Sequence, residues 1–222
     1  MTFLTQFSTL IAKDLRIEAR SRQTVGLVNV LAVLIIVVLG LGLGGRAAAF
    51  DATAVLWVAY LFSGVLCFEK TMSVERHDGA LAALMMAPMD RGVIYLAKLI
   101  SNLLLMLAIA AVVTPAGILF FSFDLSAAPG QFAIVMAASL VGFAAVGTLF
   151  ASVASSSRLQ GGLLAMMIFP ITLPLVIAST QMLIHLFRDG IPIGGLGLGV
   201  LVAFDAIFLT VSWLVFDWVL EP

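Results

Sequence analysis

The chain has 222 residues, of which 63% are hydrophobic and 10% are charged, and its formal net charge is -1. An ordinary soluble domain has about 45–50% apolar and about 25% charged residues, so this composition excludes a soluble globular protein and indicates a membrane protein. The near-neutral charge and scattered Lys and Arg residues exclude a nucleic-acid-binding surface, and the single Cys67 excludes an intrachain disulfide and any multi-cysteine metal site.

Residues 1–23 form the first predicted element, an amphipathic helix on the membrane surface. Apolar residues such as Phe3 and Phe7 recur at helical spacing and oppose a basic side that includes Lys13 and Arg16. A cleaved signal peptide is the alternative interpretation. The charges in the second half of the segment interrupt the apolar run that such a leader needs, and they favour the surface helix.

Six apolar segments follow. All but one are long enough at 1.5 Å per residue to cross a hydrocarbon core of about 30 Å, and the shorter segment 51–68 crosses with some residues from the flanking turns. The sequence therefore predicts an all-α polytopic membrane protein in a single domain, 1–222. The predicted spans are 24–45, 51–68, 92–123, 131–153, 161–183 and 200–220.

Several residues inside these segments have a specific expected role. Lys98 lies near the start of the third span, where a lysine can reach the interface, and small residues in the fourth span allow close helix approach. Pro170 and Pro174 predict a break in the helix of the fifth span, where they either line a cavity or shape the bundle.

Asp205 is an ionisable residue inside the sixth predicted span. A carboxylate there costs about 2.5–3.5 kcal/mol on insertion scales, which makes Asp205 a candidate functional residue. The alternative is that Asp205 lies about one and a half turns into the span and so is close to water.

Orientation follows from the distribution of Lys and Arg. With the N-terminus in the cytosol, nine of the eleven basic residues lie on the cytosolic side, and Arg46 and Arg188 lie outside. Both termini are then cytosolic, as is the polar segment 68–91. The segment 185–199 is predicted to be an outer loop.

Segment 68–91 is the longest charged interruption between the apolar segments. Asp78 can cap a short helix over 79–86 that places Leu81, Leu84 and Met85 on one side, and Pro88 ends it. So short a helix needs a partner surface to be stable. The charged approach before it includes Glu75. The alternative interpretation is that this charged approach is simply a solvated surface.

Other chemistries have weaker support. The sequence has no phosphate-binding loop with its lysine, so ATP would be bound by a partner, and its glycine clusters lack the βαβ context of a dinucleotide site. His77 is a weak metal-ligand candidate because no second histidine is near it in the sequence, whereas His185 is a conceivable haem ligand at the outer end of the fifth span. Without paired carboxylates or a Ser/His pair in the spans, we expect neither catalytic nor metal-binding residues.

The segments DGALAALMMAP, 78–88, and IFPITLPLVIAST, 168–180, resemble signature regions of CcmB, the haem exporter B family. The Asp-Gly-x-Leu-x-x-Leu core with its downstream proline matches Asp78, Gly79, Leu81, Leu84 and Pro88, whereas Ala82 stands where relatives often have glutamate. The length, the six spans and the surface helix fit as well, so the resemblance covers nearly the whole chain.

This resemblance implies a bacterial inner-membrane permease subunit of an ABC complex in cytochrome c maturation. It implies an ATP-binding partner subunit, two copies of each, and a separate haem-handling membrane protein. Haem is then a transported or handled species rather than a firmly bound cofactor. The subunit either delivers haem or releases a haem-loaded chaperone at the periplasmic side, and the lack of a clear haem-ligand set in the sequence favours the second.

Two other functions stay open at this point. One is an ABC permease that exports a lipid, glycan or drug. The other is an ion-coupled secondary transporter that uses Asp205 and spans broken around the prolines. A membrane enzyme ranks last.

Overall fold

The computed structural model describes residues 3–21, 23–43, 49–77, 91–121, 124–156 and 162–219. These residues are almost entirely helical and contain no strand, which confirms the all-α prediction for the part of the chain described. The elements are α1 (Phe3–Ser21), α2 (Gln23–Gly42), α3 (Ala49–His77), α5 (Arg91–Phe121), the short 3-10 helix η1 (Leu125–Ala127), α6 (Pro129–Ser156), α7 (Gly162–Arg188) and α8 (Gly195–Val219).

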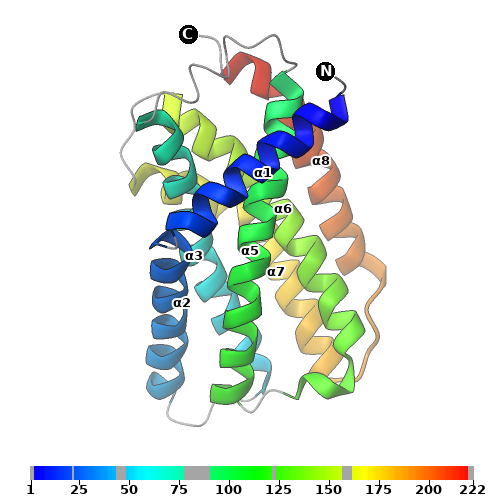
Figure 1. Ribbon diagram of the computed structural model, residues 1–222. Coiled ribbons are helices and arrows are strands. Elements are labelled where there is room, and N and C mark those ends of the chain that lie inside the picture. Colours follow the sequence, from blue (N-terminus) through cyan, green and yellow to red (C-terminus); the bar gives the residue numbers. More distant parts are fainter. Residues whose placement is uncertain are drawn as a thin grey trace.

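Six helices, α2, α3 and α5 to α8, are long and apolar enough to cross a membrane, and they stand side by side in one bundle (Figure 1). Ile36 of α2 faces the core and is fully buried, whereas Leu34 and Val38 of the same helix are exposed, as is Leu214 of α8. Apolar surface of this extent needs hydrocarbon as its solvent. The chain is a multi-pass membrane protein.

Helices α3 and α6 interlock through glycines in the middle of the bundle. A Cβ at Gly147 of α6 would overlap the ring of Phe68, and a Cβ at Gly64 of α3 would overlap the ring of Phe143. The two rings pack on each other with centroids 5.3 Å apart. Each helix thus places an aromatic ring over a glycine of the other, and the predicted close approach of the fourth span is confirmed.

Helix α1 crosses the bundle obliquely near one end and passes over α5 (Figure 1). Leu10 points into the core and is buried. Glu18 Oε1 accepts a hydrogen bond from the Val25 amide at 3.1 Å and so satisfies one of the first amides of α2. The last turn of α8 lies at the same end of the bundle as α1, as six spans require. The side of the membrane on which this end lies stays a prediction.

Helix α3 is longer than predicted. The sequence prediction ended the second span at residue 68 and treated 69–78 as a charged approach, but α3 continues to His77. Glu, Lys and Arg are good helix formers, and Met72 is buried against the core, so the helix gains packing energy beyond its apolar run. The predicted helix 79–86 lies outside the described residues.

Helix α7 is continuous through Pro170 and Pro174, so the predicted break is wrong. Each proline removes one amide donor, but in an apolar surrounding the remaining backbone groups have no alternative to helical hydrogen bonds. Between the two prolines, the Thr172 hydroxyl donates to the carbonyls of Ile168 at 3.0 Å and Phe169 at 3.2 Å. These two side-chain hydrogen bonds lie in the helical turn where the prolines remove backbone hydrogen bonds.

The outer loop is shorter than the predicted 185–199, because α7 continues to Arg188 and α8 begins at Gly195. Gly190 has a φ of +66°, and the amides of Asp189 and Ile191 both donate to the carbonyl of His185 at 3.1 Å. The left-handed glycine and these two hydrogen bonds cap the end of α7.

The start of α6 lies beside this loop. Gln131 Oε1 accepts a hydrogen bond from the Ile193 amide at 2.9 Å and ties α6 to the α7–α8 connection. Before α6, Asp124 caps η1 by accepting from the amide and hydroxyl of Ser126 at 2.9 and 2.6 Å. These hydrogen bonds hold the pKa of Asp124 below its usual value.

Candidate functional site

The predicted docking residues divide between a described helix and a segment outside it. Glu75 belongs to the last turns of α3, although its side chain is not described. The remaining docking candidates lie outside the described residues: Asp78, Gly79, Leu81, Leu84, Met85 and Pro88. Segment 78–90 joins the end of α3 to the start of α5, so the polar contacts of these two helices are the structural context of the predicted docking site.

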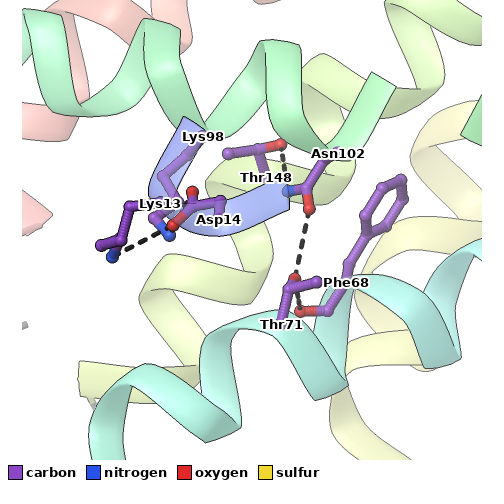
Figure 2. A network of polar contacts seen from close by, with 7 residues as sticks. All are labelled: Lys13, Asp14, Phe68, Thr71, Lys98, Asn102 and Thr148. Atoms are coloured by element: carbon purple, nitrogen blue, oxygen red, sulfur yellow. Dashed lines mark hydrogen bonds and ion pairs between the residues drawn. The ribbon is translucent and has the colours of Figure 1, made fainter. Parts of the chain in front are cut away.

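The first of these contacts is an ion pair between α1 and α5. Lys98 Nζ lies 2.7 Å from Asp14 Oδ2, and the exposed fractions of the two side chains are 7% and 12% (Figure 2). Lys13 Nζ lies 3.0 Å from the other carboxylate oxygen of Asp14 but is 34% exposed. Lys98, which was expected to reach the membrane interface, is instead buried beneath α1. It anchors the surface helix to the first of the long helices after segment 78–90.

The second contact is a buried chain of side-chain hydrogen bonds one turn further along α5. Asn102 Nδ2 donates to Thr148 Oγ1 of α6 at 2.9 Å, and the Thr71 hydroxyl of α3 donates to Asn102 Oδ1 at 3.2 Å (Figure 2). The same hydroxyl lies 3.1 Å from the carbonyl of Phe68. Asn102 and Thr148 are both buried. One asparagine therefore connects α3, α5 and α6.

Together, Asp14, Lys98, Asn102, Thr71 and Thr148 link four helices at the end of the bundle that carries α1. We call these five residues the polar network. In a low-dielectric interior such a network is stabilising when it is complete and costly when one partner is lost. The polar network therefore joins α1 to α5, and it joins α3 and α6 through α5. Among the described residues, no group of three or more His, Cys, Asp or Glu could hold a metal ion.

Asp205 lies deeper in the membrane segment than the sequence suggested. Because α8 begins at Gly195 rather than at residue 200, Asp205 is about three turns, or about 15 Å, along the helix. Its Oδ1 is buried, packs against Gly142 of α6, and has no hydrogen-bond partner among the described residues. The alternative of a carboxylate one and a half turns from the helix start is therefore wrong.

Pro170 and Pro174 line a groove of about 890 Å³ between α7 and α8. Its lining includes residues of the α7–α8 connection, and that connection lies at the end of the bundle opposite α1 (Figure 1). These prolines therefore line a cavity, and their role in shaping the bundle stays a prediction. The structure does not bring them together with the polar network, which lies near the other end.

The sequence reasoning missed the polar network. Asn102 and Thr148 stand in apolar spans, and an amide inside a span is a recognisable signal of a hydrogen-bonded interior position. Thr71 and Asp14 carry no such signal, because both occur among other polar residues. Their partners become visible only when the helices are packed.

Comparison with known proteins agrees with this architecture. A curated relative from Bradyrhizobium diazoefficiens, "Heme exporter protein B", is 24% identical over 176 residues, which cover 78% of this chain and 79% of the relative. The family model described as CcmB protein matches residues 5–220, and so includes α1, all six long helices and the polar network. The chain belongs to the CcmB family.

Proposed function

We propose that this protein is the membrane subunit of an ABC transporter that acts in cytochrome c maturation in the bacterial inner membrane. The match to the CcmB family over residues 5–220 is the observation that carries this proposal, and the name of the relative, "Heme exporter protein B", indicates haem as the cargo. The chain itself is non-catalytic in this account. ATP is bound and hydrolysed by a separate partner subunit, two copies of each subunit assemble, and a further membrane protein handles haem.

Segment 78–90 is the proposed docking site for the ATP-binding subunit. The positive-inside rule places it in the cytosol together with both chain termini, where ATP is available. The polar network supports this assignment, since the two helices joined by the segment both contribute to it. Movement of the docked segment would reach α6 through Thr71 and Asn102.

The work done by ATP hydrolysis is proposed to be haem delivery, or release of a haem-loaded chaperone, on the periplasmic side. In either case a change at the cytosolic end must reach the opposite end of the bundle. Helix α6 spans that distance: Thr148 belongs to the polar network, and Gln131 binds the α7–α8 connection.

The docking proposal is tested by copurification of the ATP-binding subunit from a complemented deletion strain. Asp78→Lys and Gly79→Pro are expected to weaken the association at least tenfold and to leave membrane insertion intact. Asp124→Asn is the matched control, because Asp124 lies at the opposite end of α5. If both docking variants retain the ATPase as tightly as the parent does, segment 78–90 is not the docking site.

A further inference from the structure

The groove between α7 and α8 has one wall of regularly spaced, mostly apolar side chains, with a histidine at its end. Pro170, Pro174, Ile177, Gln181 and His185 recur at helical spacing along one face of α7 and line the groove. Its other wall is formed by the α7–α8 connection and the first turns of α8. Its volume of about 890 Å³ lies within the range of small-molecule sites, about 300–1,000 Å³.

The backbone of His185 belongs to the α7 cap, and its ring contacts a carboxylate. Its carbonyl accepts both amides of the α7 cap, and its ring Nδ1 lies 2.8 Å from Asp189 Oδ2. Both side chains are about half exposed, so water and solutes reach them. When the carboxylate accepts the Nδ1 proton, Nε2 is the unprotonated nitrogen that can bind a metal.

A histidine oriented by a carboxylate is the usual form of a metal-ligating imidazole. A bare Zn²⁺ site needs three or four protein ligands, and the described residues contain no such group. Haem iron can be held by a single axial imidazole from the protein, because the porphyrin supplies its four equatorial ligands. An apolar groove with one oriented histidine at its end therefore fits a metalloporphyrin rather than a bare metal ion.

We propose that this groove binds haem, with the porphyrin against the apolar face of α7 and Nε2 of His185 as an axial ligand to the iron. The site rests on the proposed function, which supplies haem as the cargo. It lies near the end of the bundle opposite the polar network, where the proposed function requires haem to be delivered. A phospholipid acyl chain is the competing occupant, and it would not require the histidine.

The test uses the full chain in lipid nanodiscs, titrated with ferric haem and followed by the Soret absorbance band. The parent chain is expected to bind one haem and to give a histidine-ligated spectrum. His185→Ala should lose that spectrum and raise the Kd at least tenfold. Asp189→Asn should raise the Kd about 10- to 100-fold, as is typical when the partner of a ligating histidine is removed.

The sequence offers a matched control, since it contains two histidines. His77 terminates α3, at the other end of the bundle, so His77→Ala should bind haem as the parent does. Metal-free protoporphyrin IX should bind the parent and His185→Ala alike, because it makes only the apolar contacts. His185→Gln repeats the loss of ligation with a polar side chain of similar length.

Equal haem affinity and spectra for the parent and His185→Ala would overturn the proposal, as would loss of the spectrum in His77→Ala. Displacement of haem by added phospholipid to the same extent in the parent and His185→Ala would assign the groove to lipid instead. Failure of the proposed function has a different readout: a deletion strain would keep normal c-type cytochromes, whatever the titration gives.

Discussion

Asp14 and Lys98 are 84 positions apart in the sequence and form a buried ion pair of 2.7 Å between α1 and α5. Both charges are largely removed from water at this contact, so the pair helps to specify where the surface helix lies on the bundle. Lys98 is also one turn from Asn102, which connects α5 to α3 and α6. The position of α1 is thereby linked to the interior of the bundle.

Removing either charge of this pair should destabilise the protein. Lys98→Met or Asp14→Asn breaks this buried contact, although Lys13 still lies against Asp14 in Lys98→Met, and we expect a loss of about 3 kcal/mol in the free energy of unfolding. Thermal unfolding in detergent measures this effect. Lys13→Met is the control: it removes a more exposed lysine from the same carboxylate, and we expect a loss of at most about 1 kcal/mol. Equal losses for Lys13→Met and Lys98→Met would show that the pair does not anchor α1.

Asn102 should be the most sensitive residue of the polar network. Asn102→Ala removes the donor to Thr148 and one acceptor of Thr71, which keeps the carbonyl of Phe68, and a buried group left unpaired costs about 1–3 kcal/mol. We expect a lower melting temperature and a loss of mature c-type cytochromes, with the ATP-binding subunit still attached.

Asn29→Ala is the control for Asn102→Ala, because Asn29 Oδ1 is buried without a hydrogen-bond partner among the described residues. The same substitution there should be nearly neutral. A melting temperature for Asn102→Ala that equals that of Asn29→Ala would contradict the role of the network.

The glycine contacts between α3 and α6 should tolerate no added methyl group. In Gly147→Ala the new Cβ would overlap the ring of Phe68, and we expect a loss of about 1–3 kcal/mol from the forced displacement. Gly26→Ala is the control, since a Cβ there meets no atom within 4 Å. Thermal unfolding of both variants in the same detergent is the measurement. An unchanged melting temperature for Gly147→Ala would mean that α3 and α6 lie further apart than described.

Asp205 is predicted to serve function rather than folding. Its buried Oδ1 makes no hydrogen bond within the described part of the chain, so Asp205→Asn should insert and melt like the parent or better. We expect this variant to lose mature c-type cytochromes. Asp124→Asn, which changes a carboxylate outside the spans, should keep them. Normal cytochromes in Asp205→Asn would remove Asp205 from the functional residues.

The sequence predicted the all-α class and the six spans because long apolar runs have one stable conformation in a membrane. The predicted end of a span is wrong where packing extends the helix beyond its apolar run. Helix α3, for example, continues past residue 68 because Met72 is buried against the core. The break predicted at Pro170 and Pro174 is wrong, because proline breaks a helix in water more readily than in a membrane, where the remaining backbone groups have only helical hydrogen bonds available.

The candidate site was predictable only in part. Asp205, Pro170, Pro174 and His185 stand out by residue type, and the structure adds their depth and surroundings. The polar network joins residues far apart in the sequence, as Asn102 and Thr148 are, and no local pattern encodes which helices become neighbours. The docking residues after Asp78 rest on their sequence pattern.

In the proposed function this chain couples a partner's ATP hydrolysis to cytochrome c maturation. Its most direct test is haem staining of c-type cytochromes in a deletion strain complemented with the parent chain or with Asp78→Lys. We expect that the deletion strain lacks mature c-type cytochromes, that the parent restores them, and that Asp78→Lys, although inserted normally, does not. Normal haem-stained cytochromes in the uncomplemented deletion strain would contradict it.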